Sequence, residues 1–138
     1  MGLESANYLF KSEKAITSTV KLKSDFKELD RNKWALISEK RYWIELEPLN
    51  DYSISIRFVL CNPEKEVLNA FFTFLSFLFI NDGELIDLNT KNVFTHLNET
   101  TKEKLIESYI QKRKVFKELY GNYTAVLGVE DFYKNQIK

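Results

Sequence analysis

The stretch of residues 52–80 most constrains how this chain can fold, because it reads as one strand followed directly by one long helix. Apolar and polar side chains alternate over residues 52–61, and a period of two places them on opposite faces of a sheet. The apolar row is Tyr52, Ile54, Ile56, Phe58 and Leu60, and the polar row is Ser53, Ser55 and Arg57. We expect the last four apolar residues to be buried and the polar row to be more exposed.

A helix is predicted over residues 63–80. Asn62 suits the N-cap, because its side chain can accept hydrogen bonds from free backbone N–H groups, and Pro63 suits the first helical position. The helix is apolar almost all round, whereas a helix that covers one sheet face buries only a stripe somewhat over 100° wide. Its polar residues beyond the first turn form a narrow stripe of Asn69, Thr73 and Ser76.

Strands are predicted both before and after this helix. They are residues 7–11, 34–39, 42–47, 52–61, 84–88, 92–97 and 123–129. The three between residues 34 and 61 have short joins and predict an antiparallel meander, and the pair after the first helix predicts a hairpin. Residues 15–30 are ambiguous: their composition slightly favours a strand over 15–23 and a helical turn over 24–30.

A second helix is predicted to begin at Thr100, which forms a capping box with Glu103, and to end at Gly121. The chain of 138 residues is long enough for one independent core. We therefore predict a single α+β domain over residues 1–138. Its antiparallel sheet, a three-stranded meander plus a hairpin, is packed by two main helices.

Charge and composition exclude several classes of protein. The 20 basic residues balance the 20 acidic ones, which disfavours long-range attraction to nucleic acid or to an anionic membrane. The longest apolar run has 14 residues, short of the roughly 20 that a membrane span requires. One cysteine, Cys61, cannot form an internal disulfide, and residues 1–10 lack the apolar core of a signal peptide. We expect a cytoplasmic protein.

Two groups of residues could support catalysis. Glu45 and Glu47 share one strand face at a separation of about 7 Å, near the spacing of some hydrolase carboxylate pairs. Charged residues at alternate positions are nevertheless common on the solvent-exposed face of an antiparallel sheet, where they have no catalytic role. His96 is the only histidine, a weak basis for a metal or acid–base site, and the glycines do not form a phosphate-binding loop. We expect no metal or cofactor. A small hydrolase or transferase using the Glu45/Glu47 face or His96 is an alternative function.

A basic cluster lies on the second predicted helix and comprises Lys112, Arg113, Lys114 and Lys117. Glutamates interleave with it, and the one aromatic inside it belongs to the apolar helix face. With zero net charge, this pattern favours a solvated helix face over a nucleic-acid contact. A nucleic-acid binder acting through this Lys112–Lys117 face is the second alternative.

Two features predict a protein-binding surface. Trp43 shares the outer sheet face with Arg57, and an aromatic beside an arginine is typical of partner contacts, unless the N-terminal segment covers it. Phe71, Phe74 and Phe77 contribute to more apolar helix surface than one sheet can cover. Either the sheet and the second helix enclose these phenylalanines, or a protein partner or second copy of the chain packs beside the polar stripe. A small-molecule ligand cannot be inferred.

The order strand-strand-strand-helix-hairpin-helix, over about residues 33–120, resembles the architecture of small bacterial secretion chaperones and related dimeric partner-binding domains. Small bacterial immunity proteins are similar in being compact and non-catalytic. The resemblance implies a central helix at a dimer contact and a non-enzymatic, partner-binding function of bacterial type. This chain departs from such chaperones in not being acidic, and a likeness of architecture does not transfer function.

Overall fold

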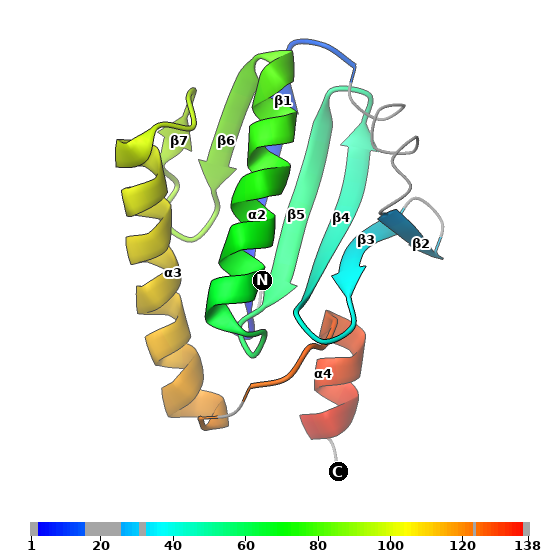
Figure 1. Cartoon of the computed structure of the whole chain (residues 1–138), viewed down its shortest axis with the longest axis vertical. Coiled ribbons are helices and arrows are strands. Elements are labelled where there is room, and N and C mark those ends of the chain that lie inside the picture. Colours follow the sequence, from blue (N-terminus) through cyan, green and yellow to red (C-terminus); the bar gives the residue numbers. More distant parts are fainter. Residues whose placement is uncertain (1–2, 16–25, 31–32, 123, 137–138) are drawn as a thin grey trace.

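The computed structural model of the chain describes residues 3–15, 26–30, 33–122 and 124–136. Its centre is one antiparallel sheet with the strand order β2-β3-β4-β5-β1-β6-β7 (Figure 1). The strands are β1 (Ser5–Ser12), β2 (Phe26–Asp30), β3 (Lys33–Ser38), β4 (Tyr42–Asn50), β5 (Ser53–Val59), β6 (Gly83–Asp87) and β7 (Val93–Phe94).

Two long helices, α2 (Glu64–Leu78) and α3 (Glu99–Tyr120), lie on one face of the sheet (Figure 1). A 3-10 turn, η1 (Phe79–Asn81), follows α2, and the short helix α4 (Val129–Gln136) lies at one end of the sheet. The predicted α+β class, with two main helices on an antiparallel sheet, is confirmed. No helix among the described residues is long and apolar enough to cross a membrane.

Strand β1 joins the two halves of the sheet. It pairs antiparallel with β5 on one edge and with β6 on the other. The meander β3-β4-β5 and the hairpin β6-β7 therefore become one continuous sheet, and α2 connects two strands that run parallel on either side of β1. The sequence predicted this strand over residues 7–11, but the alternation within a strand does not specify which neighbours it will join.

The inner face of the sheet and α2 form the core. Ile54, Ile56, Phe58 and Leu60 are buried, as the alternation predicted. The ring of Tyr8 lies 4.5 Å from that of Phe71, measured between centroids, which ties β1 directly to α2. Ser55 and Arg57 are partly exposed, but the prediction for Ser53 was wrong: it is buried. Ser53 pairs with Asn50 where the β4–β5 register shifts between Pro48 and Asn50, and strict alternation does not hold across such an irregularity.

Both helices begin differently from the prediction. The N-cap of α2 is Pro63, with no side-chain capping hydrogen bond, because the side chain of Asn62 is buried and bonds elsewhere. Helix α3 is capped by Asn98, whose Oδ1 accepts a hydrogen bond from the backbone N–H of Thr101 at 2.9 Å. The predicted capping box at Thr100 was therefore wrong by two residues.

Several short elements also differ. Residues 26–30 form the strand β2 instead of a helical turn, and the strand predicted over 15–23 lies, apart from Ala15, outside the described residues. The strand predicted over 92–97 is reduced to β7. The last predicted strand was wrong: the described residues 124–128 are irregular, and α4 begins at Val129. The N–H of Ala125 donates instead to the carbonyl of Cys61, which is not part of a strand.

Candidate functional site

The outer face of the sheet, opposite α2 and α3, carries a small polar cavity that we call the outer-face cleft. Its volume is about 160 Å³, and it is lined by Asn7, Leu29, Lys33, Glu45, Leu46, Glu47, Ser55, Arg57 and Leu88. Leu29 belongs to β2 and Leu88 follows β6, with four strands between them in the sheet. A flat sheet would hold β2 and β6 about 24 Å apart. The sheet must therefore curl toward this face.

Strand register places polar side chains of the cleft in two neighbouring rows. Glu45 of β4 pairs with Arg57 of β5, and Arg57 pairs in turn with Asn7 of β1. Glu47 pairs with Ser55 in the adjacent row. The sequence correctly placed the two glutamates and the arginine on one face, but it could not place Asn7 beside them.

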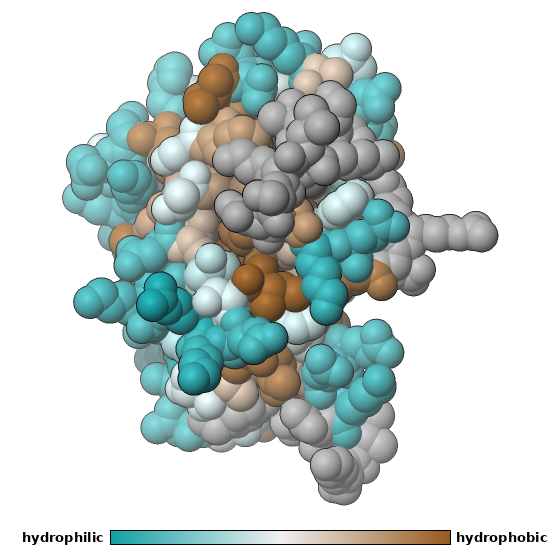
Figure 2. Space-filling view, turned by 45° about the vertical axis from the view of Figure 1, so that its right-hand side comes forward, coloured by the Kyte–Doolittle hydropathy of each residue, from teal (hydrophilic) through white to brown (hydrophobic). Residues whose placement is uncertain are grey.

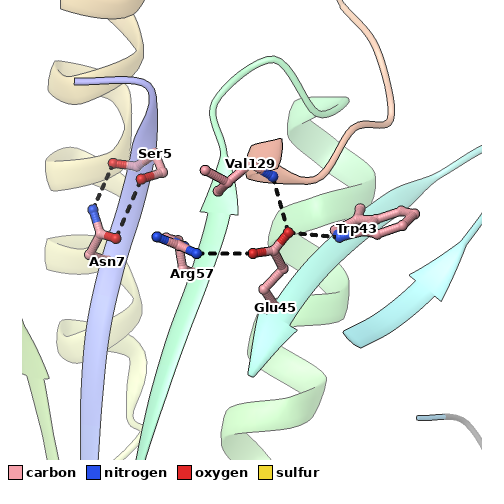
Figure 3. Close-up of polar contacts among 6 residues, drawn as sticks. All are labelled: Ser5, Asn7, Trp43, Glu45, Arg57 and Val129. Carbon is pink, nitrogen blue, oxygen red and sulfur yellow. Dashed lines mark hydrogen bonds and ion pairs between the residues drawn. The ribbon is translucent and has the colours of Figure 1, made fainter. Parts of the chain in front are cut away.

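Glu45 lies at the centre of a hydrogen-bonded cluster (Figure 3). Its Oε2 accepts from the indole Nε1 of Trp43 at 3.1 Å and from the backbone N–H of Val129 at 3.0 Å. Its Oε1 accepts from Nη2 of Arg57 at 3.2 Å, which completes an ion pair. These donors come from β4, β5 and the first residue of α4, so the carboxylate joins three parts of the fold.

Glu47 lies in different surroundings. It is exposed, and its carboxylate makes no hydrogen bond or ion pair with the described residues. The two carboxylates therefore share a sheet face but not an environment. Glu45 is held by fixed donors, whereas Glu47 lines the cleft with no such donor among the described residues.

The C-terminal part of the chain packs against Trp43, a contact that the sequence did not suggest. Gly128 lies so close to the indole that a Cβ added there would come within 2.6 Å of Nε1. Asn62 supports the same contact: its Oδ1 accepts from the backbone N–H of Trp43 at 3.0 Å, and its Nδ2 donates to the carbonyl of Leu127 at 3.2 Å. The N-cap interpretation of Asn62 missed this role.

A second surface lies beside α2, and we call it the α2 groove. Its volume is about 300 Å³, and it is lined by Phe26, Leu36, Arg41, Tyr42, Glu66, Asn69, Ala70, Thr73, Phe74 and Phe77. Figure 2 turns this side of the molecule forward and shows hydrophobic side chains gathered among hydrophilic ones.

The three predicted contact phenylalanines differ in exposure. Phe71 is fully buried and Phe74 nearly so, whereas Phe77 is half-buried. The rings of Phe74 and Phe26 meet edge-on at 5.6 Å between centroids, which joins α2 to β2. The fold thus encloses much of the apolar surface of α2, and the part that lines the groove is left beside Asn69 and Thr73, the polar stripe seen in the sequence.

The basic cluster on α3 is not a uniform solvated face. Arg113 is buried, and its Nη1 donates to the carbonyls of Leu60 and Asn62 and to the hydroxyl of Tyr109. Burial raises the pKa of Tyr109 to about 12, although the Arg113 guanidinium opposes the shift. The prediction of Arg113 as a surface cation was wrong. Helical spacing alone cannot show that the turn between β5 and α2 presents two backbone carbonyls, those of Leu60 and Asn62, to this side chain.

The other members of the cluster also differ among themselves. Lys112 is half-buried and its Nζ donates to Oδ1 of Asn89 at 2.5 Å, while burial lowers its pKa. Lys114 and Lys117 are exposed. Only Lys114 and Lys117 of the four predicted basic residues are therefore exposed on the surface that nucleic-acid binding would use.

His96 and Cys61 lie in unlike places. His96 is exposed, and Cys61 is a buried thiol in the turn between β5 and α2. Within the part of the chain that the structure describes, no three or more His, Cys, Asp or Glu side chains are grouped so that they could hold a metal ion.

Comparisons with known proteins assign the chain to no family. No protein-family model matches it, and neither a curated protein nor a solved structure matches it. A functional proposal therefore depends on the geometry of the outer-face cleft and the α2 groove.

Proposed function

We propose that this protein is a non-enzymatic protein-binding domain, and that the α2 groove receives an apolar side chain of a partner protein. The observation that carries the proposal is the groove itself. Phe26, Tyr42 and Phe77 line it together with Leu36 and Ala70. A concave apolar cavity of this kind, into which a partner inserts one large side chain, is the usual anchor of a protein interface.

The rim of the groove supports a peptide-like partner. Asn69 is exposed beside the cavity, and its side-chain amide makes no hydrogen bond with the described residues. An amide of this kind can both donate to and accept from a peptide backbone. Asn69 and Thr73 would therefore contact the polar main chain on either side of an anchor residue.

Charge at the rim narrows the partner further. Arg41 and Glu66 both line the groove, are exposed and carry opposite charges. Neither forms an ion pair with another described residue. A segment with an aromatic or large aliphatic anchor, flanked by one acidic and one basic residue, would complement both charges and gain specificity from them.

The cluster around Glu45 supports a binding role over a catalytic one. A carboxylate that accepts hydrogen bonds from an indole, a guanidinium and the start of a helix is engaged in holding those groups in place. We also propose that the protein works in a reducing compartment such as the cytoplasm, because its one cysteine is a buried thiol. Partner binding of this type would match the small bacterial secretion chaperones that the element order resembles, and the compact, non-catalytic immunity proteins.

A random-peptide display selection on the full chain tests the proposal. We expect enriched peptides to share one aromatic or large aliphatic anchor. Ala70→Glu and the milder Thr73→Glu, which place a carboxylate in the groove, should each weaken their binding at least about tenfold. Ile110→Glu changes an exposed residue of α3 that does not line the groove, and it should leave the affinity unchanged.

Sedimentation equilibrium at micromolar concentration distinguishes the possible partners. A wild-type dimer that Ala70→Glu dissociates and Ile110→Glu does not would identify a second copy of this chain as the occupant. Selected peptides whose affinity is the same for wild type and for both groove variants would overturn the proposal. Circular dichroism of each variant excludes misfolding as the cause of a loss.

A further inference from the structure

We infer that the outer-face cleft binds a small zwitterion, a molecule such as a free amino acid that carries one carboxylate and one ammonium group a few ångströms apart. This site lies on the face of the sheet opposite α2 and is separate from the groove proposed above for a partner protein. The inference comes from four charged side chains that line one small cavity, three of which (Glu45, Glu47 and Arg57) the sheet register places side by side.

Arg57 would hold the carboxylate. Its guanidinium has five N–H donors. One nitrogen, Nη2, donates to Glu45 at 3.2 Å, and no other bond from this side chain to the described residues accompanies it. Ser55, two residues along the same strand and on the same face, also lines the cleft and has a hydroxyl without a bond to the described residues. Donors therefore remain for a bound carboxylate.

Glu47 would hold the ammonium group. It pairs with Ser55 across the strands and is the diagonal neighbour of Arg57, so that their Cβ atoms are separated by about 7–8 Å. A carboxylate and an ammonium group attached to one carbon atom of a small ligand, as in a free amino acid, can bridge that separation. The carboxylate of the ligand would accept a charge-assisted hydrogen bond and its ammonium group would donate one, and such bonds are stronger than those between neutral groups.

The charge balance of the cleft favours a zwitterion over a simple ion. Lys33 and Arg57 contribute two positive charges, and Glu45 and Glu47 contribute two negative ones. A simple anion would be attracted by the two cationic side chains and repelled by the two carboxylates, and a simple cation the reverse. A zwitterion can place its carboxylate near the cationic side chains and its ammonium group near the carboxylates. Leu29 and Leu88 at the edges of the cleft leave apolar surface for a side chain, and the volume of about 160 Å³ restricts the ligand to a small molecule.

Titration of the ¹⁵N-labelled full chain with pools of free amino acids tests the inference. We expect at least one pool to shift the backbone resonances of Ser55 and Arg57 at millimolar concentration. The N-acetylated and the amidated forms of the active amino acid should each bind about tenfold more weakly, because each lacks one charge.

Glu47→Gln should weaken binding of the free amino acid by a similar factor and leave the weak binding of its N-acetylated form unchanged. Glu84→Gln is the matched control, because Glu84 is an exposed carboxylate on the same face that does not line the cleft.

Three results would overturn the inference. They are the absence of shifts in the cleft with every pool at tens of millimolar, equal affinity for a free amino acid and its N-acetylated form, and a Glu47→Gln variant that binds like wild type. Ala70→Glu, in the α2 groove, should not affect the titration. A failure of this inference is therefore distinct from a failure of the protein-binding proposal.

Discussion

The carboxylate of Glu45 accepts a hydrogen bond at 3.0 Å from the backbone N–H of Val129, a residue 84 positions further along the chain (Figure 3). Val129 is the first residue of α4, so Glu45 satisfies one of the free N–H groups at the start of that helix and places a negative charge at its positive end. One side chain of β4 thus anchors the C-terminal helix to the sheet.

Removing that carboxylate should loosen α4. We expect Glu45→Ala to lower the free energy of unfolding by about 1–3 kcal/mol, because the Val129 N–H and the Trp43 indole lose their shared acceptor. Urea denaturation measures the loss, and hydrogen exchange should show faster exchange in α4. Glu47→Ala, an exposed residue two positions along the same strand, should change stability by less than about 0.5 kcal/mol. Equal losses in both variants would contradict the anchoring role.

Arg113 should stabilise the protein more than any exposed lysine of α3. Arg113→Met removes the donor that the carbonyls of Leu60 and Asn62 share, and we expect a loss of about 2–4 kcal/mol. Lys114→Met, at the next position and exposed, is the matched control and should be nearly neutral. A near-neutral Arg113→Met in guanidinium or thermal unfolding would show that these hydrogen bonds contribute little.

Stability should fall in strongly alkaline solution, and Tyr109 should account for part of the fall. Its pKa is raised from 10.0 to about 12 in the folded state, so below pH 10 the group is protonated in both states and has no effect. Between about pH 10 and 12 the unfolded chain releases the proton and the folded chain keeps it, which lowers stability by up to about 1.4 kcal/mol per pH unit. Burial also raises the pKa of Tyr8, with the same sign.

The measurement is the free energy of unfolding of wild type and Tyr109→Phe between pH 9 and 12. The variant should lose stability less steeply above about pH 10. The lowered pKa of Lys112 has the opposite effect on stability just below pH 10.5, because the unfolded chain binds more protons there than the folded chain. Wild type and Tyr109→Phe share this effect, so it cancels in the comparison. Parallel curves for the two proteins would show that Tyr109 ionises normally.

Gly128 should tolerate no side chain. A Cβ at this position would lie 2.6 Å from both Nε1 of Trp43 and Oε2 of Glu45, so Gly128→Ala must move the segment away from the sheet. We expect a destabilisation of about 1–3 kcal/mol and a change in the fluorescence of Trp43, measured in a Trp34→Phe background. In a Trp43→Ala background Gly128→Ala should destabilise the protein less, because only the clash with Oε2 of Glu45 remains, and an unchanged destabilisation would contradict the proposed clash with the indole.

Local periodicity was sufficient to predict much of the fold. The alternation over residues 52–61 correctly placed Ile54, Ile56 and Phe58 on the buried face, because the period of a strand is a property of its own backbone. The same reasoning predicted the two long helices within a few residues and placed Glu45, Glu47 and Arg57 on one sheet face. Helix starts were less accurate, since a capping side chain such as Asn62 could find better partners elsewhere.

The sequence by itself determined the two long helices, most of the strands, and the apolar face of the central strand β5. Only the tertiary structure decided that β1 lies between β5 and β6, that Arg113 is buried, and that Glu45 holds α4. The physical reason is the separation of the partners along the chain. Arg113 bonds to a carbonyl 53 residues away, and Glu45 bonds to an N–H 84 residues away, so neither partner is visible in local spacing. Each of these hydrogen bonds forms only when packing brings its two segments of the chain together.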